Sequence, residues 1–322
     1  MSSVTNRLRN FLLKPQSSIW LTILRVGLGL QVLCYGLSLR GDWLELLGRE
    51  NQGLIRRDLT EAILSARSPF IPRVGWMDIG AHLGLSEPTV LWTVWTVLMV
   101  AALLVAVGLF CRISSAVVWL LYLSTAKSAE LLSYGVDNFT IIGLFYLAIA
   151  PLPDSMALDA RWRGILPGNA TLQGLHRRVL QFHVCIIYFF GGISKCAGRG
   201  WWNGVSLWRA LTRAPFDIVP PEILIRASFI LPLIGILVCV MEATYAIFIW
   251  PRKTRFLWFA GVLGMHVGIA LMMGMYLFAS VMIVLNLAAF GPGFAFNRSG
   301  ACTVGHPTTA SRATLAAKDL SA

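Results

Sequence analysis

Few side chains inside the long apolar segments of this sequence could carry chemistry, and Lys195 stands out among them. It ends the run Gly191-Gly192-Ile193-Ser194-Lys195. A charged residue at the centre of a membrane helix costs about 2.5–3.5 kcal/mol, so each such residue is a functional candidate. A buried lysine can become a neutral amine that takes up a proton near neutral pH, and the glycines let a helix or a ligand approach closely. The alternative is a lysine that extends to the outer headgroups from a helix end.

A second set of polar residues flanks the Tyr134-Gly135 turn. Lys127 and Glu130 precede the turn, and Asp137 and Asn138 follow it. Counting residues from the turn places all four at the level of Lys195, near the outer membrane boundary. They predict either a polar outer cluster or a local ion pair of Lys127 with Glu130 or Asp137.

Glu242 and His266 form a third set. Lys253 lies at the centre of the turn between them, 11 residues after Glu242 and 13 before His266. At about 1.5 Å per residue the two side chains lie at nearly one depth. A buried carboxylate needs a partner, so we expect a Glu242–His266 pair that is either structural or a proton relay. Arg25 would extend inward or neutralise an internal acid.

The composition predicts a membrane protein to hold these residues. Of the 322 residues, 57% are hydrophobic and 13% are charged, and the mean hydropathy is +0.69. These values exclude a soluble globular domain, a disordered chain and a coiled coil. The net charge of +12 comes from basic clusters between apolar blocks, which orient membrane helices, and we expect no nucleic-acid partner.

The apolar blocks predict an all-α, polytopic membrane protein with about eight transmembrane helices. A crossing needs about 20 apolar residues. The predicted spans are residues 19–39, 89–110, 113–132, 138–152, 179–197, 227–250, 256–272 and 275–290. Because the fourth is short and the last two are separated only near Gly274, seven and nine crossings are alternatives.

Charge asymmetry predicts that both termini are cytoplasmic. Eight crossings place 14 Lys/Arg and 3 Asp/Glu inside, and 12 Lys/Arg and 11 Asp/Glu outside, as the positive-inside rule requires. We expect a cytoplasmic segment at 1–18, a transmembrane domain at 19–291 with an outer loop at 40–88, and a disordered cytoplasmic tail at 292–322. The six cysteines form no CxxC pair, so we expect no metal site.

The order of short motifs resembles the HTTM (horizontally transferred transmembrane) domain family, which is related to the membrane domain of vitamin K-dependent gamma-carboxylases. The resemblance covers about residues 19–291. It rests on Leu24-Arg25-Val26, Asp42, Gly53, Gly108-Leu109-Phe110-Cys111-Arg112, Tyr134-Gly135-Val136-Asp137-Asn138, Leu158-Asp159, Gln181, Tyr188, Gly192-Ile193-Ser194-Lys195, Trp202-Asn203-Gly204, Glu242 and His266.

The resemblance implies a lysine base that deprotonates a reduced quinone of the vitamin K type. It assigns that role to Lys195 and a pocket role to His266, while Asn138 stands where the carboxylases have a histidine. We expect the cofactor to contact Lys127, Asp137, Tyr188 and Gly192. The size resembles stand-alone bacterial members, including the sporulation-delaying protein B type, which takes part in maturing a secreted toxin peptide.

Two functions follow as hypotheses for a multi-pass protein of the inner (plasma) membrane. The first is a quinol-dependent enzyme with Lys195 as base near the outer leaflet. The second is a non-catalytic protein that binds a lipid, a quinone or a partner, and that serves the maturation or export of a secreted peptide. The environment of Lys195 separates the two.

Overall fold

The computed structural model describes residues 3–49, 56–77 and 84–291, and its regular elements in these ranges are all helices. This confirms the all-α prediction. Gly53 and the predicted tail at 292–322 lie outside the described residues.

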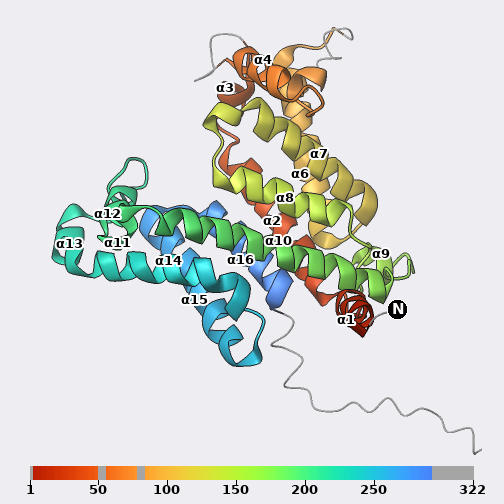
Figure 1. The fold of residues 1–322 in the computed structure, drawn as a ribbon. Coiled ribbons are helices and arrows are strands. Elements are labelled where there is room, and N and C mark those ends of the chain that lie inside the picture. The colour runs from red at the N-terminus through yellow and green to blue at the C-terminus, as the bar shows by residue number, and fades with distance from the viewer. Residues whose placement is uncertain (1–2, 50–55, 78–83, 292–322) are drawn as a thin grey trace, which may run out of the picture. The chain divides into compact units, whose positions relative to one another are not determined.

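Eight main helices occupy the eight predicted segments (Figure 1). They are α2 (Ile19–Ser38), α6 (Glu87–Val107), α7 (Cys111–Ser128), α8 (Gly135–Ala148), α10 (Ala170–Cys196), α14 (Leu231–Phe248), α15 (Arg252–Met273) and α16 (Tyr276–Phe290). Five are long and apolar enough to cross a membrane, namely α2, α6, α10, α15, and α14 together with the short helix η3 (Ser228–Ile230). The apolar helices α8 and α16 are shorter.

The helix α7 is less apolar because it carries several hydroxyl side chains, which are nevertheless buried. Ser114, Ser124 and Thr125 each donate to a carbonyl oxygen in the preceding turn of the chain. A hydroxyl satisfied in this way needs no water. The polar face of α7 can therefore pack inside the bundle.

The largest boundary error of the sequence prediction is at α10, which begins at Ala170 rather than at residue 179. The side chain of Asn169 caps the helix by accepting from the Thr171 and Leu172 amides. The extra turns include His176, Arg177 and Arg178. These residues are too polar to be counted in a membrane span by hydropathy, but they are compatible with a helix.

At the centre of the bundle lie α2 and α16, which contact each other. The helix α2 also contacts α6 and α8. The helix α16 also contacts α8, α10 and α15. The helices α2 and α6 are antiparallel, because Gly36 lies against Met99 whereas Gly29, earlier in α2, lies against Ala106, later in α6. The order of ring contacts between α10 and α14 is also antiparallel, from Phe182–Trp250 beyond the end of α14 to Tyr188–Tyr245.

The predicted outer loop and the segment between α10 and α14 contain short helices. In the first are α3 (Trp43–Leu47), α4 (Arg57–Arg67) and η1 (Val74–Met77); in the second are α11 (Arg199–Trp202), α12 (Val205–Leu211) and α13 (Pro221–Arg226). The first segment is anchored to the bundle, because the buried Trp43 donates to the Leu91 carbonyl of α6 and Glu61 accepts from Ser128 of α7. The short helices of the first segment are therefore held against the bundle by buried hydrogen bonds.

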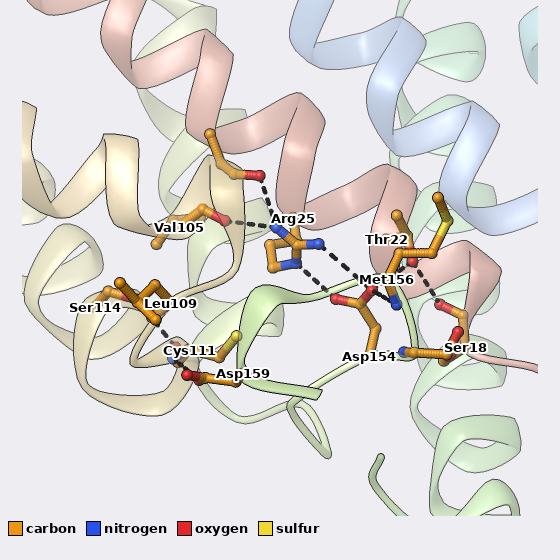
Figure 2. A network of polar contacts seen from close by, with 12 residues as sticks. Ser18, Thr22, Arg25, Val105, Leu109, Cys111, Ser114, Asp154, Met156 and Asp159 are labelled. Atoms are coloured by element: carbon orange, nitrogen blue, oxygen red, sulfur yellow. Dashed lines mark hydrogen bonds and ion pairs between the residues drawn. The ribbon is translucent and has the colours of Figure 1, made fainter. Parts of the chain in front are cut away.

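A buried ion pair joins α2 to the segment between α8 and the next helix, as Figure 2 shows. Arg25 Nε lies 2.6 Å from Asp154 Oδ2, and both side chains are almost completely buried. Arg25 Nη1 also donates to the Val105 and Ala106 carbonyls at the end of α6. Arg25 therefore neutralises an internal acid, which was one of its two predicted roles, and it satisfies helix-end carbonyls that have no partner within the helix.

Two motifs that are distant in the sequence meet beside this pair. Asp159 lies in α9 (Leu158–Arg161) and accepts from the amides of Phe110 and Cys111, where α7 begins. Burial acts to raise the pKa of Asp159, but these amides and Arg163 outweigh it and hold the pKa below its usual range. The left-handed Gly108 (φ +81°) permits the turn, since a Cβ there would lie 2.7 Å from Ala157 Cα.

We predict that Asp154→Asn lowers the free energy of unfolding in detergent by about 3–5 kcal/mol, because it leaves the Arg25 charge buried without a counter-ion. The control is Arg163→Gln. The Arg163 side chain is 44% exposed in its ion pair with Asp159, so its loss should cost about 1 kcal/mol or less. Denaturant titration would measure both, and equal losses would contradict a structural role for the Arg25–Asp154 pair.

Candidate functional site

One face of α10 carries a row of three polar side chains and one glycine, from the middle of the helix to its C-terminal end. Gln181, Tyr188, Gly192 and Lys195 are separated by seven, four and three residues, a spacing that keeps them on one side of a helix. Gln181 donates to the Ala289 carbonyl near the end of α16. The other residues of the row meet α14, α15 and α16 nearer the opposite end.

Lys195 forms an ion pair with Glu242 of α14. The distance from Lys195 Nζ to Glu242 Oε2 is 2.5 Å, and the side chains are 26% and 8% exposed. The ammonium also lies 5.5 Å from the centre of the Trp201 ring. Lys195 is thus neither enclosed in an apolar pocket nor free among headgroups; it is held at the edge of the bundle by a carboxylate inside it.

A buried hydrogen-bond network lies two turns of α10 away from Lys195. Asn286 Nδ2 lies within hydrogen-bond distance of the Met282 carbonyl and of Tyr188 Oη. Because a carbonyl can only accept, the amide nitrogen of Asn286 must face it, and this nitrogen donates to both oxygens. Tyr245 donates to Asn286 Oδ1. Tyr188 Oη accepts from Asn286, so it uses its own hydrogen to donate to His266 Nε2, and these two atoms lie 2.7 Å apart. Because Nε2 accepts, the neutral imidazole of His266 carries its proton on Nδ1.

The Nδ1 atom of His266 is buried and has no hydrogen-bond partner in the described part of the chain. The whole residue is 2% exposed. A buried donor without an acceptor costs about 1–3 kcal/mol. The chain of hydrogen bonds from Tyr245 through Asn286 and Tyr188 therefore ends in one unused donor.

The expected Glu242–His266 pair is replaced by two other interactions, because Glu242 binds Lys195 and His266 binds Tyr188. Equal depth along two helices says nothing of the direction in which each side chain points. Both partners come from α10, which the spacing around the Lys253 turn does not include.

The remaining predicted residues do not join Lys195. Lys127 pairs with Glu130 at 2.8 Å, as the local alternative predicted. Asp137 accepts from Tyr122 Oη and from the Tyr134 amide, where it helps to cap α8. Asn138 is exposed on α8. In the part of the chain that is described, no hydrogen bond or ion pair connects Lys127, Asp137 or Asn138 to Lys195.

Sequence reasoning missed Asn286 and Tyr245, which organise the network. In the apolar segments the candidates were charged groups and histidines, and an uncharged amide or a tyrosine in an apolar helix escapes that criterion. The isolated Asn286 in α16 was the available signal, since a buried amide must find partners.

An apolar groove of about 300 Å³ lies between α12, α14 and α15. Its lining is rich in methionine and glycine, including Met241, Gly264, Met265, Gly268 and Met272. A Cβ at Gly264 or Gly268 would meet no atom within 4 Å. Flexible methionine side chains adapt to varied apolar ligands. Separately, no group of three or more metal-binding side chains gathers in the described ranges.

We predict that Gly192→Ala loosens the contact of α10 with α14, while Gly191→Ala is tolerated. A Cβ at Gly192 would lie 2.2 Å from the Ala243 nitrogen, whereas a Cβ at Gly191 would lie 3.4 Å from Glu242 Oε2. Overpacking of this kind costs about 1–3 kcal/mol. Thermal unfolding in one detergent would compare the variants, and equal melting temperatures would show that the helices can separate without loss.

Comparison with known proteins identifies the family. The family profile described as the HTTM domain matches residues 81–292, which begins after α2 and is therefore shorter than the resemblance expected from about residue 19. A search of curated proteins and a search of solved structures found no match. The profile covers most of the chain, including Lys195, Glu242, His266 and Asn286, and the chain therefore belongs to the HTTM domain family.

Proposed function

We propose that this HTTM protein is a quinol-dependent membrane enzyme in which Lys195 is the base. The observation that carries the proposal is the Lys195–Glu242 ion pair at 2.5 Å, on the same face of α10 as Tyr188.

Glu242 supplies what a lysine base requires, a place to transfer its proton. Two ions in a medium of low polarity are costly, and transfer of a proton from the ammonium to the carboxylate neutralises both. Lys195 then holds a neutral amine facing the membrane edge. The amine then removes a proton from a substrate hydroxyl, which leaves the Lys195 ammonium, a protonated Glu242 and a substrate anion that the ammonium stabilises. The ion pair returns when Glu242 releases its proton to the product or to water.

Two features fit a reduced quinone as the molecule bound here. The His266 Nδ1 donor is without an acceptor in the described residues, which suits a ligand with carbonyl or hydroxyl oxygens. The apolar groove suits a hydrophobic tail. A bound quinol would supply an acidic hydroxyl and two reducing electrons, while Tyr188 and Asn286 would fix the orientation of His266.

The groove also supports the second function, a non-catalytic protein that binds a lipid, a quinone or an apolar peptide. Methionine-lined apolar surfaces favour such binding without any proton transfer. Under this function the Lys195–Glu242 pair only joins α10 to α14, and the protein would assist the maturation or export of a secreted peptide.

We further propose eight crossings of a bacterial inner membrane with both termini in the cytoplasm. The alternating directions of neighbouring helices and the basic inner segments support this topology. It places Lys195 toward the outer leaflet and Arg25 toward the inner one.

To test the topology, single cysteines would replace Leu59 in α4 and Lys253 at the start of α15, in a background without the native cysteines. Both side chains are exposed. We expect an impermeant thiol reagent applied outside the cell to label only position 59, and position 253 to react only after the membrane is opened. Labelling of both from one side would exclude eight crossings.

To test the base, Lys195→Arg would be compared with Lys253→Arg. Arginine keeps the charge and can pair with Glu242, but it does not deprotonate in a protein. We expect Lys195→Arg to reduce the oxidation of a reduced naphthoquinone probe in air by about 10²–10⁴-fold, relative to the purified wild type and a protein-free blank. Lys253→Arg, at an exposed lysine near the start of α15, should retain the rate.

The same assay separates the two functions. Glu242→Gln should also lose the rate, because the amide cannot accept the proton of Lys195. If Lys195→Arg is fully active while Lys195→Ala is not, the lysine is a structural charge, and the binding function replaces the enzymatic one.

A further inference from the structure

Three arginines gather at the end of the bundle where α10 and α15 begin. Arg177, Arg178 and Arg255 lie near enough for their charges to repel one another, and Arg252 adds a fourth charge beside Arg255. We call Arg177, Arg178 and Arg255 the inner arginine cluster. Within the described residues, no ion pair joins any of the three to a carboxylate, unlike Arg25 or Lys195.

Neutral acceptors hold each guanidinium in place. Arg177 donates to Ala289 O and Gln16 Oε1, Arg178 to Phe11 O and Gln181 Oε1, and Arg255 to Ile249 O and Trp250 O. A guanidinium has five N–H donors. Each arginine therefore keeps donors and a full charge that its fixed partners do not neutralise.

Aromatic rings place the cluster at the level of a membrane interface. Phe11, Phe182 and Trp250 contact one another with centroid separations of 5.5–6.3 Å. The Arg178 guanidinium carbon lies 4.1 Å from the centre of the Phe11 ring. It also lies 5.8 Å from the centre of the Trp250 ring, and tryptophan favours the headgroup region of a bilayer.

The helix α1 (Ser3–Leu12) extends this surface. Its apolar side chains Val4 and Leu8 are 72% and 57% exposed, and Arg7 and Arg9 lie between and beside them. A short helix of this pattern lies in the plane of a membrane, with its apolar face among the acyl chains. Phe11, near the end of α1, links it to Arg178.

We propose that the inner arginine cluster binds the phosphate of an anionic phospholipid, with α1 lying against the same leaflet. Guanidinium groups form paired, charge-assisted hydrogen bonds to phosphate oxygens, and an anion at this point removes the repulsion among the three cations. The chemistry fits a free phosphate ion equally, but the aromatic rings and the apolar face of α1 favour a headgroup with attached acyl chains. The inference does not depend on the function of Lys195.

The test uses the full chain in nanodiscs of phosphatidylcholine, with or without phosphatidylglycerol. We expect phosphatidylglycerol to raise the melting temperature of the wild type, and native mass spectrometry to find it retained in preference to phosphatidylcholine. Arg255→Gln should reduce that preference about fivefold, as expected for one cation near an anionic surface. Arg161→Gln, at an exposed arginine of α9, is the matched control.

The outcomes are distinct. An unchanged lipid preference in Arg255→Gln would overturn the proposal, as would an equal loss in Arg161→Gln, which would indicate only general attraction. If Arg255→Gln melts lower in phosphatidylcholine alone and still gains the full stabilisation from phosphatidylglycerol, Arg255 is merely structural. Stabilisation of the wild type by inorganic phosphate in phosphatidylcholine, dependent on Arg255, would replace the lipid by a free anion and overturn the lipid assignment.

Discussion

The constraint on which this structure depends is that a charge inside the helix bundle must be matched there, because the hydrocarbon around it cannot solvate an ion. Arg25 meets the constraint with Asp154 and two carbonyls at the end of α6. Lys195 meets it with Glu242. Each pair joins segments that are distant in the sequence, so the cost of burying the ions is offset only when the whole bundle has formed.

The same constraint explains the structure of α10. Its polar face can be tolerated only where other helices supply partners, and α14 and α16 do so along its length. Gly192 brings α14 so close that a Cβ would reach the Ala243 backbone, and this short separation lets Glu242 reach Lys195. The polar residues of α10 and Gly192 therefore act together, because the close packing at the glycine makes the ion pair possible.

Hydrophobic block length predicted the main helices well, since each of the eight apolar segments overlaps one of them, and five are long and apolar enough to cross a membrane. Local pairing was also predictable, as with Lys127 and Glu130, which are separated by less than one helical turn. The partners of Glu242 and His266 were not, because depth can be counted along a chain but the direction of a side chain depends on how each helix is rotated. Asn286 and Asp154 were missed for a related reason, since their roles depend on distant residues that no local pattern specifies.

The two buried polar networks differ in one respect that bears on function. Around Arg25, the carboxylate of Asp154 also accepts from Thr22 and Met156, and the charged groups have close partners on every side. Around Tyr188, the hydrogen bonds end at His266 Nδ1, for which the described residues supply no acceptor. A network that is complete needs nothing further and is explained by stability alone. A network that leaves a buried donor unused carries a cost that a bound oxygen atom would remove, which is why the proposed ligand site lies on the side of His266 and Lys195 rather than on the side of Arg25.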